Sequence, residues 1–424
     1  MCSLSLLRVR CFSTRLNGSV GARSSSAASG SRSPSSESDI TGSSQKKATP
    51  LLRGMLLDHA VDLRNVRTGD RLDIPYELTI TETLQDFWFA AFFDQSRIHT
   101  SRPFCRQMGL QDRVLPFALA VFLTSSMSHA DAAKVQVGFG RVSYLWPLFS
   151  GDTVTKSFTV NAVRNTSDGN HSVIHFTCDL KNQRGRLCMR ADKRMLFQFP
   201  VNFASNVTMS PPDEDEVNIH LFRDHLLSKG TTAVLAQQPS HSLTRLEPGQ
   251  LILHSLHRTL TFAQSQQLAS LARLTHSRHF DTRRYDRGSE ILIPGGLVLG
   301  LTLSASARDF HEVLHEEIVS CSYNNALHPD TDIVGAVSYV SHVDDSLPGD
   351  LELVTVTTLG VKNVHARTEL VDIELPLSLF TPGIYSKEME QICKEWCPML
   401  SGKIVVQVTR KLVRQANHKQ VFLL

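Results

Sequence analysis

Asp94 and His99 are two side chains whose types and spacing could do acid–base chemistry together. They lie in a polar segment between two apolar stretches, with four residues between them. A carboxylate and an imidazole on one loop can hold a water molecule, take a proton from it and relay that proton to a neighbouring atom. The same spacing arises often by chance, so the elements around the pair must show whether it forms a site.

The pair lies inside a repeat of about 180 residues, found by sliding the sequence along itself. The overall identity between the two copies is low, but the matches fall at equivalent structural signals. They include Gly69 with Gly249, His99 with His279, Leu119 with Leu299, Ser126 with Ser306, and Asp152 with Asp332. The chain therefore contains two copies of one structural unit.

Each copy is predicted to contain the same series of elements. A strand at residues 72–81 or 251–261 is followed by a short amphipathic helix and a polar loop that ends in the histidine. A very apolar helix follows at residues 115–127 or 296–306, and alternating apolar and polar residues then indicate several antiparallel strands. This order predicts α+β architecture, with a sheet wrapped around a central helix in each copy.

Three segments lie outside the two copies, which we place at residues 46–198 (copy one) and 246–376 (copy two). Residues 1–45 begin with 36 residues that hold five arginines, twelve serines and no acidic side chain, the composition of a mitochondrial transit peptide. Residues 199–245 are expected to be a linker, and residues 377–424 a C-terminal extension with one helix and one strand. The leader predicts import into the mitochondrial matrix.

The composition of the remaining chain argues against several classes of protein. Without residues 1–36 there are 39 basic and 41 acidic side chains, so no strongly basic body favours a nucleic-acid partner. No apolar run approaches the roughly 20 residues of a membrane-spanning helix. The eight cysteines include no CxxC pair, and no GxGxxG or GxxxxGK[ST] motif occurs. We therefore expect no metal, no cofactor and no membrane span.

Three features of copy one resemble the MaoC-like, R-specific enoyl-CoA hydratases, a family with the hot-dog fold. The first is the Asp-x4-His spacing of Asp94 and His99. The second is the P-L-F-S-G-D-T-V run at residues 147–154, which is similar to the family's entry into its second strand. The third is Ser126, near the position of the family's third polar site residue. The double arrangement is similar to mesaconyl-CoA hydratase-type proteins and to the two-hot-dog hydratases of lipid metabolism. The resemblance implies two tandem hot-dog domains that form an intramolecular pseudo-dimer, with a homodimer left open.

The resemblance also implies a reaction and a role for each residue. The reaction is hydration of enoyl thioesters, or dehydration of 3-hydroxyacyl thioesters, carried by CoA or acyl carrier protein. Asp94 would polarise the water, His99 would hold it and relay a proton, and Ser126 would orient Asp94 or the thioester. The amide of Ala118, at the start of the central helix, would bind the thioester oxygen, and Arg97 would meet a CoA phosphate.

The sequence departs from the family pattern at defined positions. Ser96 and Arg97 stand where the family usually has Asn-Pro, and residues 115–118 read Leu-Pro-Phe-Ala where it usually has His-Gly. In copy two, Leu274 occupies the position of the acid, although His279 and the Gly-Gly pair at residues 295–296 remain. Copy two is therefore predicted to carry a degenerate site.

These departures leave two further functions open. One is a non-catalytic hot-dog subunit of a larger mitochondrial assembly, such as the ribosome. The other is a thioesterase, in which the carboxylate would activate water against the carbonyl carbon. Non-catalytic roles also remain open for three residues. Ser126 would be a packing residue bonded to its own backbone, Arg97 a solvated surface side chain, and His279 a structural histidine.

Overall fold

We describe the fold from a computed structural model. It describes residues 52–55, 62–126, 133–205, 207–209, 221–230, 246–348 and 351–415. Residues 1–57 and 58–424 form two separate units, and every element below belongs to the second. The expected transit peptide and much of the expected linker lie outside the described residues.

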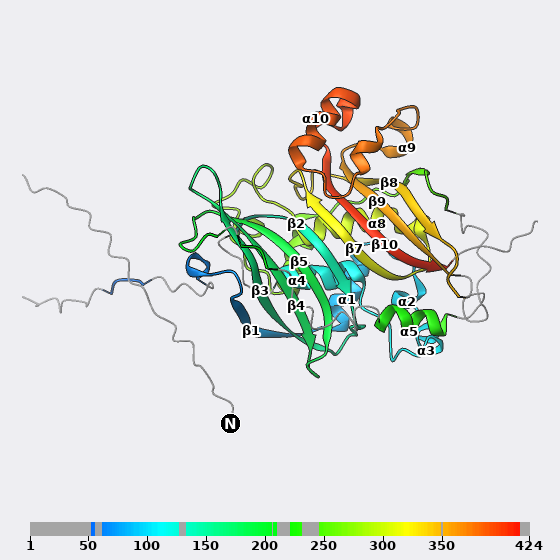
Figure 1. The fold of residues 1–424 in the computed structure, drawn as a ribbon, viewed down its shortest axis with the longest axis horizontal. Helices are drawn as coiled ribbons and strands as arrows, with labels where there is room; N and C mark the ends of the chain where they lie inside the picture. The colour runs from blue at the N-terminus through cyan, green and yellow to red at the C-terminus, as the bar shows by residue number, and fades with distance from the viewer. Residues whose placement is uncertain are drawn as a thin grey trace, which may run out of the picture. The chain divides into compact units, whose positions relative to one another are not determined.

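Within the described residues, ten strands form one antiparallel sheet, in the order β1-β3-β4-β5-β2-β7-β10-β9-β8-β6 (Figure 1). Copy one supplies β1 (Arg71–Thr79), β2 (Ala133–Tyr144), β3 (Thr153–Asn165), β4 (Ser172–Asn182) and β5 (Leu187–Phe197). Copy two supplies β6 (Leu251–Leu253), β7 (Val313–Tyr323), β8 (Val334–Asp344), β9 (Leu351–Lys362) and, from beyond residue 376, β10 (Ile404–Gln415). The expected α+β fold, with two copies forming one pseudo-dimer, is confirmed.

The two copies meet where β2 pairs with β7 at the centre of the sheet. Gly138 of β2 lies opposite Ser322 of β7. A Cβ atom on Gly138 would lie 2.1 Å from the carbonyl oxygen of Cys321, so a larger residue there would push the two strands apart. The joint between the copies therefore depends on glycine at this position.

Two central helices, α4 (Phe117–Ser125) and α8 (Gly295–Phe310), pack against each other and against the sheet (Figure 1). A Cβ atom on Gly296 would lie 2.5 Å from the Phe122 ring, so the helix crossing explains this glycine. Each copy also has the expected first helix, α1 (Glu82–Ala91) or α7 (Phe262–Leu271). The expected capping box at Thr261 and Gln264 is present at the start of α7.

Short helices complete the described chain. They are η1 (Leu63–Asn65), α2 (Arg97–Thr100), α3 (Arg102–Gln107), α5 (Leu221–Lys229), η3 (Ser277–His279), α9 (Ala366–Glu369), η4 (Leu377–Phe380), α10 (Ser386–Trp396) and η5 (Pro398–Leu400). The C-terminal segment that we expected as an extension thus contributes a helix outside the sheet, α10, and an interior strand, β10, which lies between β7 and β9. The sheet of copy two therefore continues past residue 376.

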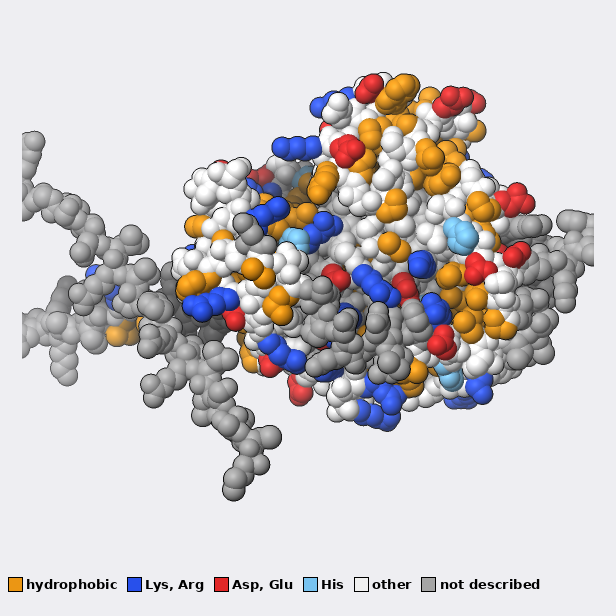
Figure 2. All heavy atoms as spheres, in the orientation of Figure 1, with side chains coloured by type: hydrophobic (Ala, Val, Ile, Leu, Met, Phe, Trp, Pro, Cys, Tyr) orange, Lys and Arg blue, Asp and Glu red, His pale blue; other side chains and the backbone are white. Residues whose placement is uncertain are grey.

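Charged side chains of both signs are interspersed over the face of the molecule shown in Figure 2. They do not gather there into one large basic surface, which agrees with the charge balance of the sequence. Among the described residues, no helix combines the length and the apolar character needed to cross a bilayer.

Two lysines are buried at the C-terminal end of α4. Lys156 of β3 donates a hydrogen bond to the carbonyl of Ser126, and Lys193 of β5 donates one to the carbonyl of Thr124 at 3.4 Å. The last carbonyls of a helix carry partial negative charge, so cations are favoured there. Burial works against the charge: it lowers the pKa of Lys156 well below its usual value and that of Lys193 to about 8.

This burial predicts a pH-dependent contribution of Lys193 to stability. Between pH 8 and 10.5 the unfolded chain keeps the lysine proton that the folded chain releases, so the contribution of Lys193 to stability rises with pH. From pH 7 to 9.5, wild type should gain about 2 kcal/mol of unfolding free energy relative to Lys193→Met. Urea denaturation of both proteins at the two pH values measures this. Only the difference is informative, because burial raises the pKa of the adjacent Cys178 thiol to about 11. An unchanged difference would contradict the prediction.

Candidate functional site

Asp94 and His99 lie close enough for one water molecule beside them to bond to both. Asp94 Oδ2 lies 3.9 Å from His99 Nε2, too far for a direct hydrogen bond but short enough for one water to reach both atoms. His99 Nδ1 lies 3.0 Å from the carbonyl oxygen of Val114. Because a carbonyl can only accept, Nδ1 carries the hydrogen and Nε2 of the neutral ring is left as an acceptor toward Asp94.

The two side chains differ in their exposure to solvent. The His99 side chain is 7% exposed, whereas the Asp94 side chain is 21% exposed, so the carboxylate forms the open side of the pair. Asp94 Oδ1 accepts a hydrogen bond from the amide of Ser96, which leaves Oδ2 free to turn toward His99. The loop backbone therefore holds the carboxylate in this orientation.

Arg97 is buried, so its expected position at the surface is wrong. Its Nε donates to Glu312 Oε2 of copy two at 2.9 Å, its NH2 group donates to the Gln415 side chain at 3.3 Å, and its guanidinium lies over the Phe104 ring. The physical reason is the neighbouring copy, which presents a carboxylate to this loop. The guanidinium stabilises the contact between the copies, and its contact with a CoA phosphate stays a prediction.

Further contacts hold the Asp94 loop against copy two. The amide of Phe93 donates to Ser304 Oγ on α8 at 2.5 Å, and the Gln95 side chain donates to the carbonyl of Arg308 at 3.0 Å. The equivalent loop of copy two contacts copy one in turn, since His276 Nε2 lies 2.8 Å from the carbonyl oxygen of Ala133. Each candidate site is thus completed by the other copy.

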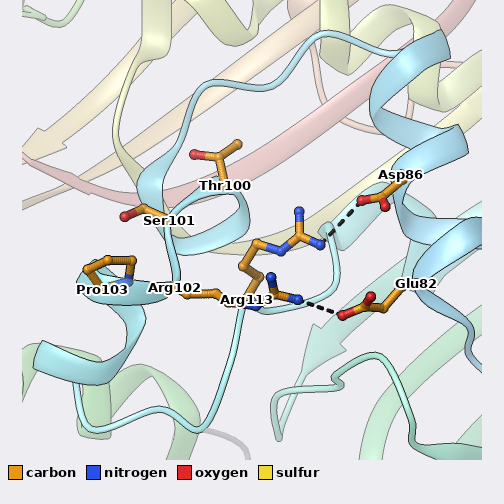
Figure 3. A pocket seen from close by; sticks show the side chains of 7 residues that line it. All are labelled: Glu82, Asp86, Thr100, Ser101, Arg102, Pro103 and Arg113. Atoms are coloured by element: carbon orange, nitrogen blue, oxygen red, sulfur yellow. Dashed lines mark hydrogen bonds and ion pairs between the residues drawn. The ribbon is translucent and has the colours of Figure 1, made fainter.

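A polar surface depression lies beside this loop (Figure 3). Arg102 reaches Glu82 at 2.5 Å, and Arg113 reaches Asp86 at 3.2 Å, so both ends of the segment after His99 are tied to α1. Exposed ion pairs of this kind contribute little stability each. Their effect here is to fix the direction of the segment that follows His99.

Ser126 and Ala118 lie at opposite ends of the central helix α4. Ala118 is in the first turn, where backbone amides lack helical partners, and it follows Val114, which holds His99, by four residues. Ser126 is fully buried at the C-terminal end, and its hydroxyl donates to the carbonyl of Leu123. This contact matches the packing role left open from the sequence, and the catalytic role of Ser126 stays a prediction.

Copy two reproduces the histidine geometry without the acid. His279 Nδ1 donates to the carbonyl of Leu292 at 2.8 Å, as His99 does to Val114. Burial lowers the pKa of His279 to about 4, so the ring is neutral at physiological pH. Leu274 replaces the carboxylate, and no group of three or more His, Cys, Asp or Glu in the described part of the chain is placed to hold a metal.

A cavity of about 240 Å³ lies at this second histidine. Its apolar wall includes Phe122 and Met195 from copy one and Leu292 and Val298 from copy two. His279 lines it as well. The cavity therefore lies between the copies, beside the degenerate site.

Solved structures share this architecture. A MaoC domain protein dehydratase from Chloroflexus aurantiacus aligns with a TM-score of 0.64 and 16% identity, over 83% of this chain and 96% of that protein. A Mycobacterium tuberculosis protein described as having a double hot-dog fold aligns with a TM-score of 0.58 and 13% identity, over 82% and 97%. The chain has the double hot-dog fold of MaoC-like dehydratases. A further MaoC-like dehydratase aligns with a TM-score of 0.52 and 11% identity, over 83% and 99%. No protein-family model and no curated protein matches the sequence.

The double hot-dog arrangement explains why the sequence did not reveal the site residues that come from the other copy. Gln136 of β2 and Tyr323 of β7 line the same cavity, although they belong to different copies. Glu312 meets Arg97 across the same boundary. A repeat aligned with itself shows which residues are equivalent, but it does not show which residues of one hot-dog copy face the other.

Proposed function

We propose that this protein is a mitochondrial hydro-lyase that interconverts enoyl and 3-hydroxyacyl thioesters at the Asp94–His99 pair of copy one. The observation that carries the proposal is the 3.9 Å gap between Asp94 Oδ2 and His99 Nε2, with Nδ1 held by Val114. Both facing atoms are acceptors, so they suit the two hydrogens of a single water molecule. The double hot-dog fold shared with MaoC-like dehydratases supports the same reaction class.

The proposed reaction follows from this geometry. The water oxygen forms a bond to the β-carbon while the pair removes one water proton, and the π electrons of the double bond move toward the thioester carbonyl. The proton held by the pair then passes to the α-carbon, which completes the 3-hydroxyacyl thioester. Dehydration follows the same path in reverse.

The negative charge that develops on the thioester oxygen needs hydrogen-bond donors. Amides in the first turn of α4 are suited to this, because they have no partner within the helix and carry partial positive charge. We assign this role to the amide of Ala118, which follows the residue that holds His99 by four positions. A backbone donor serves without the glycine that the family usually has there.

The matrix location and the carrier of the thioester also belong to this proposal. Residues 1–36, rich in arginine and without an acidic side chain, support mitochondrial import. CoA and acyl carrier protein both present the acyl group as a thioester, and the Asp94–His99 pair acts only on the acyl part. Either carrier is therefore compatible with the chemistry.

Incubation of the purified chain with crotonyl-CoA tests the function. We expect loss of the conjugated double-bond absorbance, formation of 3-hydroxybutyryl-CoA and no release of free thiol. Release of CoA thiol would instead support a thioesterase. No turnover, together with co-migration in a large particle from mitochondria, would overturn the proposal in favour of a non-catalytic subunit.

A further inference from the structure

The C-terminal segment exposes a group of large apolar side chains. Tyr385 and Trp396, at the two ends of α10, are 75% and 66% exposed, and Val371, Ile373 and Leu377 in the preceding chain are also exposed. We call these five side chains the C-terminal patch. Figure 2 shows apolar side chains gathered over α9, α10 and the chain between them, with acidic side chains beside them. Exposed apolar side chains that gather in this way commonly mark an interaction site.

The segment that carries the patch is anchored on the sheet by other residues. On its inward side, α10 buries Met389 and Cys393 in a hydrophobic cluster that also contains Leu359 of β9 and Leu379 of η4. This cluster is separate from the main core of the two copies. The exposed aromatic side chains of α10 therefore add little to its attachment and are available to a partner.

Three apolar side chains of α10 lie in one row along the helix. Ile392 follows Tyr385 by seven residues and precedes Trp396 by four, and at 3.6 residues per turn these spacings place all three on one face. Glu388 and Glu395, which are exposed and again seven residues apart, lie along one edge of this row. An apolar row with a spacing of seven and flanking charges is the pattern by which one helix packs against another.

The charges beside the row are acidic. Residues 366–396 carry six acidic and three basic side chains. The lysines of α10 lie on the side away from the row, and one of them, Lys394, reaches Glu390 at 3.7 Å. The charges nearest to a partner on the row are thus those of Glu388 and Glu395. They attract a basic partner, whereas a two-fold pair of α10 helices would bring the same glutamates together and an anionic membrane would repel them.

We propose that the C-terminal patch docks an amphipathic helix of another protein. The apolar side of that helix packs on Tyr385 and Trp396, and its lysine or arginine side chains meet Glu388 and Glu395. The two aromatic side chains supply most of the affinity, because aromatic anchors dominate the binding energy of interfaces. The glutamates select the partner by charge. The proposal does not depend on the proposed function, since it uses no residue of the proposed reaction.

Two synthetic helical peptides test this surface on the full chain. Both have about 21 residues in three heptads with leucine at the apolar positions, and the flanking positions are lysine in one and glutamate in the other. Fluorescence anisotropy of the labelled peptides at about 0.15 M salt should show about tenfold tighter binding of the lysine peptide. Trp396→Ala should weaken that binding about tenfold or more. The double variant Glu388→Lys with Glu395→Lys should reverse the preference between the peptides.

The matched control is Tyr76→Ala with Glu77→Lys. It removes an exposed tyrosine and reverses an exposed glutamate on β1, the edge strand of copy one, and should bind the lysine peptide as wild type does. The substituted side chains of α10 and β1 are all exposed, so the melting temperatures of these variants should not fall.

Three results would overturn the proposal. One is absence of binding of the lysine peptide, or binding that neither Trp396→Ala nor the charge reversal weakens. Another is a dimer in analytical ultracentrifugation that Trp396→Ala converts to a monomer, which would show that a second copy covers the patch. The third is Trp396-dependent binding to vesicles that contain phosphatidylserine, without binding of the lysine peptide, which would assign the patch to a membrane surface.

Discussion

Asp94→Asn should lower the rate of crotonyl-CoA hydration by about 10²–10⁴-fold. The substitution keeps the size of the side chain and one oxygen acceptor, but it removes the negative charge that takes a proton from water. His99→Ala should lower the rate by a comparable factor, because the water would lose its second acceptor. Since both groups hold one water, the double variant should be little slower than either single variant.

The control for this prediction is His279→Ala. His279 has the same kind of backbone contact as His99 but no acid beside it, since Leu274 takes that position. We expect a lower melting temperature and little change in hydration rate. Steady-state rates and thermal melts of all four variants provide the comparison. If His279→Ala abolished hydration in a folded protein while Asp94→Asn did not, the active copy would be copy two.

Glu312→Gln should destabilise the protein by about 3–5 kcal/mol, because it leaves the buried guanidinium of Arg97 without its counter-charge. The Glu312 side chain is 3% exposed and the Arg97 side chain 11%, so water cannot replace the lost partner. Glutamine keeps the size of glutamate and adds no new backbone strain at this position, where φ is +51°. Urea denaturation at pH 7 measures the loss.

The double variant Arg97→Met with Glu312→Gln distinguishes a buried charge from general damage. Without the guanidinium there is no unpaired charge to bury, so the double variant should be more stable than Glu312→Gln alone. A loss below about 1 kcal/mol for Glu312→Gln, typical of an exposed pair, would show that this contact does not hold the copies together.

Much of the fold follows from periodicity and caps in the sequence. The helix predicted from residue 82 begins at Glu82 as α1, and the capping box at Thr261 begins α7, because these signals act within one turn of helix. The strand predicted at residues 251–261 shortens to β6, residues 251–253. Residues 254 and 258 keep only isolated backbone contacts with copy two's own strand β8, so the local pattern alone overestimated the length of the strand.

The parts of the site that depend on long-range packing were harder to predict. Lys156 lies between Val154 and Phe158 on the inward face of β3, where alternation predicts an apolar residue. Its partner is the end of α4, which only the folded chain brings close. The burial of Arg97 could not be predicted for the same reason. A loop arginine is usually solvated, and its partner Glu312 lies 215 positions away in the sequence.

Because the two copies are covalently linked, their assembly does not depend on protein concentration, and each copy can change its sequence separately. In a symmetric homodimer every substitution appears twice, and dilution separates the subunits. Here β2 and β7 join within one polypeptide, so dilution leaves both halves assembled, each with the neighbour that completes its site. Residue 274 can also be a leucine while residue 94 stays an aspartate. One chain can thus keep two unequal compartments in a fixed one-to-one ratio.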